Sequence, residues 1–233
     1  MRKPERICGI LGGMGPEATV YLMNRIIANT DAGEDGHHVR CLVDQNPQVP
    51  SRIKAILEGA EDPGPDLAKM ASGLEAAGSD FLCMPCNTAH YWLSEITSGI
   101  KTPFLDMPDL ACMDAARAAP GAKCGIMATP ATRLKGIYDA RCARHGLEAI
   151  YPAEDDQAAL LEIINEVKAG NHGGGRRLAA IAARLAQAGA SSVILACTEL
   201  SVLGVAEENG LKVIDALESL AREIVSRAGA DSK

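Results

Sequence analysis

Two cysteines occupy matching positions in the two halves of this chain. Cys86 follows an apolar run at residues 80–84, Cys197 follows a second apolar run at residues 192–195, and the two lie 111 residues apart. A cysteine thiolate acts as a base or nucleophile, a thiol can donate a proton, and a nearby helix N-terminus favours the thiolate. The residue type and spacing therefore indicate paired thiol chemistry, in which one sulfur takes up a proton and the other releases one.

The elements that must position these cysteines form an internal repeat. Residues 67–78 (LAKMASGLEAAG) align without gaps on residues 178–189 (LAAIAARLAQAG) at the same offset of 111. Each copy places apolar residues at i, i+3, i+4 and i+7, a pattern typical of an amphipathic helix, and each ends at a glycine. A short apolar strand is predicted directly after each helix, so both cysteines are expected at strand ends.

Two further matches extend the repeat. Residues 8–12 (CGILG) match residues 124–128 (CGIMA), and residues 104–106 (FLD) resemble residues 213–215 (VID). Both halves then alternate strands with helices, which predicts parallel sheets covered by helices. The expected fold is α/β, with two similar Rossmann-like or flavodoxin-like domains related by pseudo-two-fold symmetry.

One of the two predicted domains is formed by two separate segments of the chain. We expect one domain to comprise residues 1–100 plus 210–233, because a helix predicted at 216–227 returns to the first sheet, and the other to comprise residues 101–209. Ligands of open α/β sheets bind beyond the carboxyl ends of the strands, so the active site is expected in the interdomain cleft. Two thiols on opposite sides of a ligand suit racemisation or epimerisation, which removes a proton from one face and returns it on the other.

Composition narrows the classes of partner. The 233 residues carry a formal net charge of −7 and only one Trp, four Tyr and two Phe, which disfavours nucleic-acid binding. No stretch reaches the roughly 20 apolar residues of a membrane span, and no signal-peptide core is apparent. The eight cysteines are then best interpreted as free thiols in a reducing compartment. A cytoplasmic protein with a small-molecule ligand, and with no nucleic-acid or membrane partner, is predicted.

Four segments carry a resemblance to a known family: residues 12–16 (GGMGP), 84–90 (MPCNTAH), 129–132 (TPAT) and 196–199 (ACTE). The chain resembles the aspartate/glutamate racemases, cofactor-independent enzymes that invert amino acids with two cysteines. The first two segments look most like the aspartate racemase branch, in which glycine is usual where this chain has Ala196. The resemblance implies an isomerase with Cys86 and Cys197 as catalytic residues, an amino acid as substrate, no cofactor, and a homodimer.

The same resemblance implies a substrate site. Arg52 and Lys168 would hold the side-chain carboxylate of aspartate or glutamate, and Met14 would line the pocket. His90 and Glu199 are candidates for acting through neighbouring residues, Glu199 either as a helix cap or by orienting the Cys197 thiol. The α-carboxylate and amine would be bound by a set of hydroxyl, amide and backbone donors at the strand ends: Asn87, Thr88, Thr129, Thr132 and Thr198.

Other interpretations remain open. Residues 13–18 (GMGPEA) fit the glycine pattern of nicotinamide-dependent oxidoreductases, although the matching segment 129–132 lacks the glycines. Cys83 and Cys86 form a C-x-x-C, which occurs in redox proteins, and with His90 and Cys197 they have zinc-ligand chemistry. A broad-specificity amino-acid or hydantoin racemase, or a non-catalytic amino-acid-binding protein, would use the same loops. Only the binding protein would tolerate serine at both cysteines.

Overall fold

The structure is a computed structural model that describes residues 3–207 and 210–233. The chain divides into two compact units, Met1–Met107 with Leu217–Lys233, and Pro108–Ala216. Within the described ranges, every helix is too short or too polar to cross a membrane. The two units are called unit 1 and unit 2 below, and each is described by itself.

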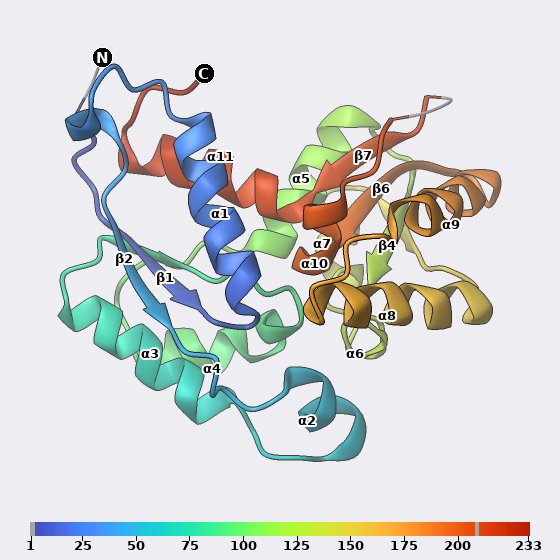
Figure 1. The fold of residues 1–233 in the computed structure, drawn as a ribbon, viewed down its shortest axis with the longest axis horizontal. Helices are drawn as coiled ribbons and strands as arrows, with labels where there is room; N and C mark the ends of the chain where they lie inside the picture. Colours follow the sequence, from blue (N-terminus) through green and yellow to red (C-terminus); the bar gives the residue numbers. More distant parts are fainter. Residues whose placement is uncertain (1–2, 208–209) are drawn as a thin grey trace. The chain divides into compact units, whose positions relative to one another are not determined.

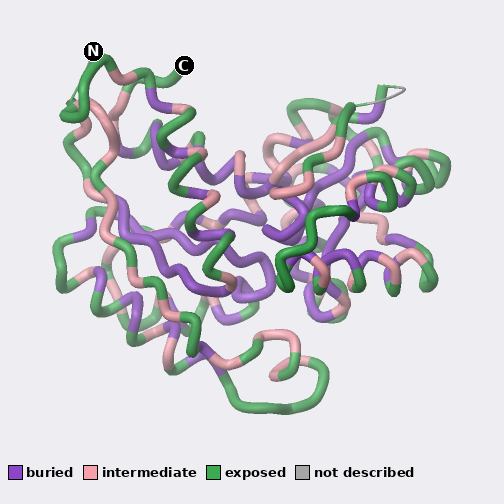
Figure 2. Tube along the Cα trace, viewed as in Figure 1, coloured by how far each residue is buried: buried purple, intermediate pink, exposed green. Residues whose placement is uncertain are grey.

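Unit 1 contains a three-stranded parallel sheet in the order β2-β1-β3. The strands are β1 (Cys8–Gly12), β2 (Cys41–Gln45) and β3 (Phe81–Cys83). All residues of β1 and β3 are buried, whereas the edge strand β2 is partly exposed (Figure 2). This difference explains why the repeat is easier to recognise in the sequences of β1 and β3 than in that of β2.

Helices cover both faces of this sheet, with α1 and α11 on one side and α3 with α4 on the other (Figure 1). The apolar positions of α3 pack on the strands, with Leu67, Met70 and Leu74 in the core of unit 1. The helices are α1 (Pro16–Asn29), α2 (Arg52–Glu58), α3 (Gly64–Ala76), α4 (Leu93–Ser98) and α11 (Ala216–Ala228), with short 3₁₀ turns η1 (Asp35–His37) and η2 (Thr88–Trp92).

Unit 2 contains a four-stranded parallel sheet in the order β5-β4-β6-β7. Helices α8 and α9 lie side by side against it (Figure 1), and their apolar faces form its core with β6. The strands are β4 (Lys123–Ala128), β5 (Glu148–Ile150), β6 (Ala190–Ala196) and β7 (Lys212–Asp215). The helices are α5 (Met107–Ala118), α6 (Pro130–Leu134), α7 (Asp139–Arg144), α8 (Glu154–Lys168), α9 (Gly175–Gln187) and α10 (Thr198–Leu203).

The predicted repeat is visible in the topology, because the order β2-β1-β3 of unit 1 matches the order β5-β4-β6 of unit 2. The matching glycines Gly9 and Gly125 also share a packing role. A Cβ atom on Gly9 would lie 2.4 Å from the side chain of Leu82, and one on Gly125 would lie 3.0 Å from the side chain of Leu185. The α/β fold with two parallel sheets is therefore confirmed.

The third sequence match, residues 104–106 with residues 213–215, is only partly reproduced. Residues 213–215 belong to β7, but Phe104 forms a single parallel bridge with Leu82 instead of a strand. The Leu82 N–H donates to the Pro103 carbonyl at 2.8 Å, and the Leu105 N–H donates to the Leu82 carbonyl at 2.8 Å. Proline has no N–H to extend such a ladder, which accounts for its short length.

Glu218 of α11 ties the C-terminal helix to α1. Its carboxylate accepts hydrogen bonds from Arg25 Nε at 2.6 Å and from Asn29 Nδ2 at 2.9 Å. Burial raises the pKa of Glu218, but the hydrogen bonds from Arg25 and Asn29 outweigh burial and hold this pKa below its ordinary value. A carboxyl whose pKa is lowered by folding stabilises the fold above its unfolded-state pKa and loses that effect as pH falls through the folded-state pKa.

We therefore expect Glu218→Gln to lower the free energy of unfolding near neutral pH by about 1 kcal/mol, after allowance for solvent screening of a partly exposed pair. Urea denaturation at several pH values measures this, and the difference from wild type should shrink as the medium becomes acidic. Glu223→Gln, which removes an exposed i,i+4 partner of Arg227, serves as the control. A loss at Glu218 that is independent of pH would contradict the proposed contribution of the ionised carboxylate.

Candidate active site

Cys86 lies at the carboxyl edge of the sheet of unit 1, three residues beyond the end of β3. Its N–H donates to the Met84 carbonyl at 2.9 Å, which turns the chain sharply after the strand. The residue is 7% exposed, and the neighbouring Asn87 and Thr88 are buried with it at the start of η2. The thiol is thus placed at the strand end, as predicted, in a surrounding of polar side chains.

His90 holds this turn in place. Its Nδ1 lies 2.8 Å from the Cys86 carbonyl, and its Nε2 accepts the Met107 N–H at 3.3 Å. Because Nε2 is the acceptor, the ring proton is assigned to Nδ1, which donates to the carbonyl of Cys86. A neutral imidazole with both nitrogens bonded to backbone positions the cysteine turn and leaves neither nitrogen for proton transfer. The expectation that His90 acts through a neighbouring residue is consistent with this geometry.

Arg52 begins α2 and is surrounded by backbone carbonyls at the same edge of the sheet. Its Nη1 donates to the carbonyls of Val49 and Pro50 at 3.0 and 2.9 Å, and its Nη2 donates to the Met14 carbonyl at 3.2 Å. Its Nε is buried and has no hydrogen-bond partner among the described residues. Buried donors are nearly always bonded, so this nitrogen is available to an oxygen that the protein itself does not supply. The structure brings Met14 and Arg52 together.

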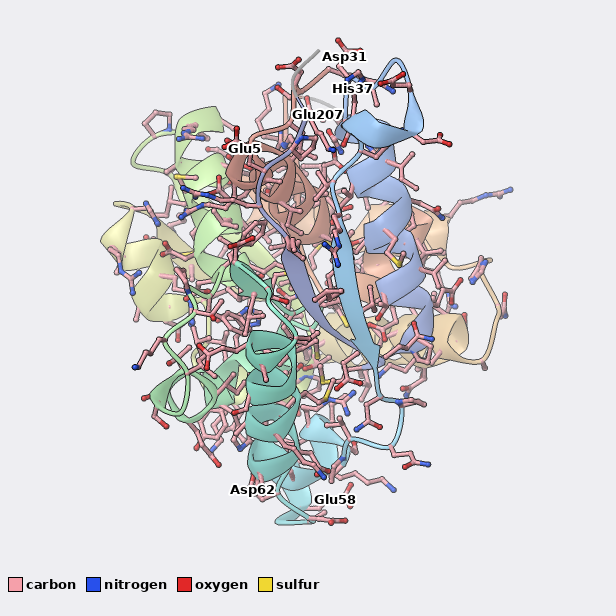
Figure 3. All side chains as sticks on the ribbon, turned by 90° about the vertical axis from the view of Figure 1, so that its left-hand side faces the viewer. Glu5, Asp31, His37, Glu58, Asp62 and Glu207 are labelled. Atoms are coloured by element: carbon pink, nitrogen blue, oxygen red, sulfur yellow. The ribbon has the colours of Figure 1, made fainter. Side chains whose placement is uncertain are left out.

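His37 lies outside this region. It belongs to η1, at the amino end of β2, whereas the candidate site is at the carboxyl ends of the strands. Figure 3 shows His37 and Asp31 at the opposite end of unit 1 from Glu58 and Asp62, which belong to the segment around α2. His37 therefore lies at the opposite end of the strands from Cys86.

In unit 2, Thr129 and Thr132 lie beyond the end of β4. The Thr129 hydroxyl caps α6 by accepting the Thr132 N–H at 3.2 Å, and the two hydroxyl oxygens are 3.0 Å apart. Both residues are buried. Two buried threonine hydroxyls fixed by a helix cap are suited to binding a carboxylate.

Gln157 of α8 was not among the predicted site residues. Its Nε2 donates to the Ala128 carbonyl at 2.8 Å, directly before Thr129, and its buried Oε1 has no partner among the described residues. A buried acceptor without a donor is costly unless water or a ligand satisfies it. The available signal was a polar residue on the apolar stripe of α8, in line with Leu160 and Ile164.

Cys197 follows β6 and begins α10, and its sulfur is bonded to a carboxylate. The Cys197 Sγ donates to Glu199 Oε2 at 2.9 Å, and the other oxygen, Oε1, lies 3.8 Å from Lys168 Nζ at the end of α8. The hydroxyl of Thr198 lies 3.5 Å from Oε2. The structure therefore brings four predicted residues of unit 2 into one chain of contacts that runs from ammonium to carboxylate to thiol.

Cys83, the other half of the C-x-x-C, points into the core of unit 1. It is fully buried, and its Sγ lies 3.8 Å from that of Cys8. A hydrogen bond from the Cys41 thiol to Cys8, together with burial, raises the pKa of Cys41 well above its ordinary value. Cysteines of this kind are packing residues, as the repeat predicted for Cys83.

Three cysteines of unit 2 form a similar buried group. The sulfur atoms of Cys112 and Cys142 are 3.4 Å apart. A hydrogen bond to Cys142, together with burial, raises the pKa of Cys124 well above its ordinary value. All eight cysteines are free, and among the described residues no group of three His, Cys, Asp or Glu side chains is arranged to hold a metal ion.

Each unit is thus a parallel α/β sheet that carries a cysteine beyond the carboxyl end of its third strand, and this arrangement defines a duplicated α/β protein with one such cysteine in each half. Residues 11–224 match the model of the Asp/Glu/Hydantoin racemase family, and the chain belongs to this family.

The chain is also similar to individual proteins in sequence and in structure. The chain is 32% identical to the Picrophilus torridus aspartate racemase, with a TM-score of 0.85 and coverage of 98% of this chain and 96% of that one. It is 27% identical to the broad specificity amino-acid racemase RacX of Bacillus subtilis (strain 168), over 94% of this chain and 96% of the relative. The glutamate racemase RacE1 of Bacillus anthracis, 16% identical, shares the fold with a TM-score of 0.68 over 98% of this chain and 83% of that one.

Proposed function

We propose that this protein is a cofactor-independent amino-acid racemase that interconverts L- and D-aspartate, or L- and D-glutamate, by proton transfer between the substrate and two cysteines. The observation that carries the proposal is the equivalence of Cys86 and Cys197, which follow the third strand of matching parallel sheets. A two-base racemase requires one thiolate to remove the α-proton while the thiol on the other face donates one. The two sulfurs then exchange roles for the other enantiomer.

The α-carboxylate is proposed to bind to the donors at the strand ends, together with backbone N–H groups. The α-proton of an amino acid is weakly acidic, and the carbanion needs fixed donors to stabilise the charge that develops on its carboxylate. Buried hydroxyls that are already held by hydrogen bonds, such as those of Thr129 and Thr132, require little reorganisation. The proposed set on the two units is Asn87, Thr88, Thr129, Thr132 and Thr198.

Specificity is proposed to depend on the substrate's side-chain carboxylate, which Arg52 and Lys168 would bind. Arg52 has a buried Nε without a partner among the described residues, and Lys168 has a side chain that is 39% exposed, with further N–H donors besides the one toward Glu199. Arginine binds carboxylates through two parallel hydrogen bonds, so Arg52 is the stronger anchor of the two. Met14, whose carbonyl accepts from Arg52 and whose side chain packs in the core of unit 1, is proposed to line the same part of the site.

A broad-specificity amino-acid racemase is the second candidate, favoured by the 27% identity to such an enzyme over nearly the whole chain. The two candidates use the same thiols and differ in how much they depend on Arg52 and Lys168. A broad enzyme would turn over neutral amino acids or hydantoins about as well as aspartate.

A chiral assay of the purified, reduced protein tests the proposal. L-aspartate, L-glutamate and L-alanine are each incubated without added cofactor, and the D-enantiomer is measured by chiral chromatography. Rapid appearance of D-aspartate or D-glutamate with little D-alanine supports the acidic-substrate racemase, whereas similar rates for all three support the second candidate. Binding of these amino acids without turnover, retained when both cysteines are serine, would instead indicate a binding protein.

The homodimer implied by the family resemblance is also proposed. Multi-angle light scattering of the purified protein should then give twice the chain mass of 24.4 kDa. The mass of one chain at assay concentrations would contradict it.

A further inference from the structure

The hydrogen bond from the Cys197 thiol to Glu199 has a direction that bears on the chemistry. The sulfur is the donor and a carboxylate oxygen is the acceptor, at 2.9 Å, inside a site where Glu199 is 8% exposed. An ionised carboxylate accepts but does not donate, so it stabilises the thiol and opposes a thiolate in the same place. The contact with Glu199 therefore favours the protonated thiol of Cys197, which can act as a proton donor.

The Lys168 ammonium counteracts this effect. It lies 3.8 Å from Glu199 Oε1, on the side of the carboxylate away from the Cys197 contact. A positive charge at this position offsets the negative charge of Glu199, which weakens the repulsion that a Cys197 thiolate would meet. Lys168 and Glu199 come from α8 and α10, which pack on each other.

The surroundings of α10 also include Asp215 and apolar core residues. Asp215, at the end of β7, is a charged group that contacts α10, and its carboxylate accepts the Ser201 hydroxyl at 2.6 Å. From α8, β4 and β6 the core around Cys197 is apolar, including Leu160, Met127 and Leu195. Electrostatic screening inside such surroundings is weak, so the charges of Glu199 and Lys168 act strongly on the sulfur.

We propose that Glu199 is a positioning residue that holds Cys197 as a protonated thiol in the substrate-free protein, and that Lys168 adjusts how firmly the proton is held. The inference rests on the proposed function, because it assigns the state in which Cys197 enters the reaction. For the enantiomer whose α-proton faces Cys86, the Cys86 thiolate takes that proton, and the Cys197 S–H bond breaks as its proton forms the new Cα–H bond. Cys197 is left as a thiolate, offset by Lys168, until the reverse reaction or solvent returns a proton.

The pH dependence of thiol alkylation tests this inference without any need for turnover. The full-length reduced protein is treated with iodoacetamide across a pH series, and the rate at each cysteine is measured by peptide mass spectrometry. Glu199→Gln removes the negative charge and supplies an amide donor, so the pH midpoint for alkylation of Cys197 should fall by about one unit. Lys168→Met should raise this midpoint by a similar amount, and Lys168→Arg should restore it.

Matched controls separate this role from a general charge effect. Glu166→Gln removes a carboxylate that pairs with Arg177, and Lys212→Met removes an ammonium that pairs with Glu207, both in unit 2. Neither control should move the Cys197 midpoint, and the Cys86 midpoint should stay unchanged in all variants.

The inference is overturned if the Cys197 midpoint does not move in the Glu199 and Lys168 variants, or if the controls move it equally. Should Glu199→Gln fail to fold, the half-exposed Lys168 position decides, and an unchanged midpoint in Lys168→Met overturns the inference. Failure of the proposed function has a different signature. Opposite midpoint shifts in a protein that racemises no amino acid would support the thiol-holding role of Glu199 and contradict the racemase.

Discussion

Replacing either Cys86 or Cys197 by serine should reduce the rate of aspartate racemisation by about 10³-fold or more. A serine hydroxyl has almost the shape of the thiol but is far less acidic, so it can neither serve as the base nor release its proton readily. Because each turnover uses both sulfurs, one substitution should stop conversion in both directions. Initial rates with L- and D-aspartate, measured by chiral chromatography, check this expectation.

Cys41→Ala is the matched control for the cysteine variants. Cys41 lies on the edge strand β2, and its thiol is held in the hydrogen-bonded group with Cys8. We expect this variant to keep nearly full activity. Racemisation that persists in the Cys86 or Cys197 serine variant would show that a different group transfers the proton, and the two-thiol mechanism would have to be abandoned.

Replacing Arg52 by methionine should have the second largest effect. Two charge-assisted hydrogen bonds to a substrate carboxylate contribute on the order of 3 kcal/mol, which corresponds to about a hundredfold loss of kcat/KM for aspartate. Arg52→Lys keeps the charge but not the planar fork, so its loss should be smaller, about tenfold. Steady-state kinetics with both enantiomers measure these losses.

Arg52 also bonds to the carbonyls of Val49, Pro50 and Met14, so a loss of structure must be separated from a loss of substrate contact. The residual activity toward alanine makes this separation, because alanine has no side-chain carboxylate to bind. We expect the loss to be much greater for aspartate than for alanine. Equal losses for the two substrates would mean that Arg52 maintains the loop and takes no part in specificity.

The repetitive parts of the fold could be predicted because local pattern determined them. The strand predicted at residues 8–12 is β1, and the two aligned segments with helical periodicity lie in α3 and α9. These elements are buried on one side, so their apolar spacing is visible in the sequence. The strand predicted at residues 104–106 is reduced to one bridge, because its pairing with Leu82 depends on tertiary position next to a proline.

The contacts of the candidate site were less accessible to prediction. Lys168 and Glu199 are separated by all of α9 and β6, so only the packing of α8 on α10 brings them together. The carbonyls around Arg52 and the Met107 N–H bonded to His90 are backbone groups, which leave no mark on residue types. The types of the site residues could therefore be predicted from the sequence, whereas the groups that they contact depend on the three-dimensional fold.

Solvent deuterium exchange tests the central claim most directly, since it follows the proton itself. L-aspartate is converted by the wild-type protein in D₂O, and the Cα isotope of the first D-aspartate formed is measured by mass spectrometry. Two thiols, one removing protium and the other donating a solvent-derived deuteron, predict deuterium at Cα of nearly every product molecule while the remaining L-aspartate stays protiated early in the reaction. Product that retains its protium would require a single base that returns the same proton, and would contradict the two-cysteine account.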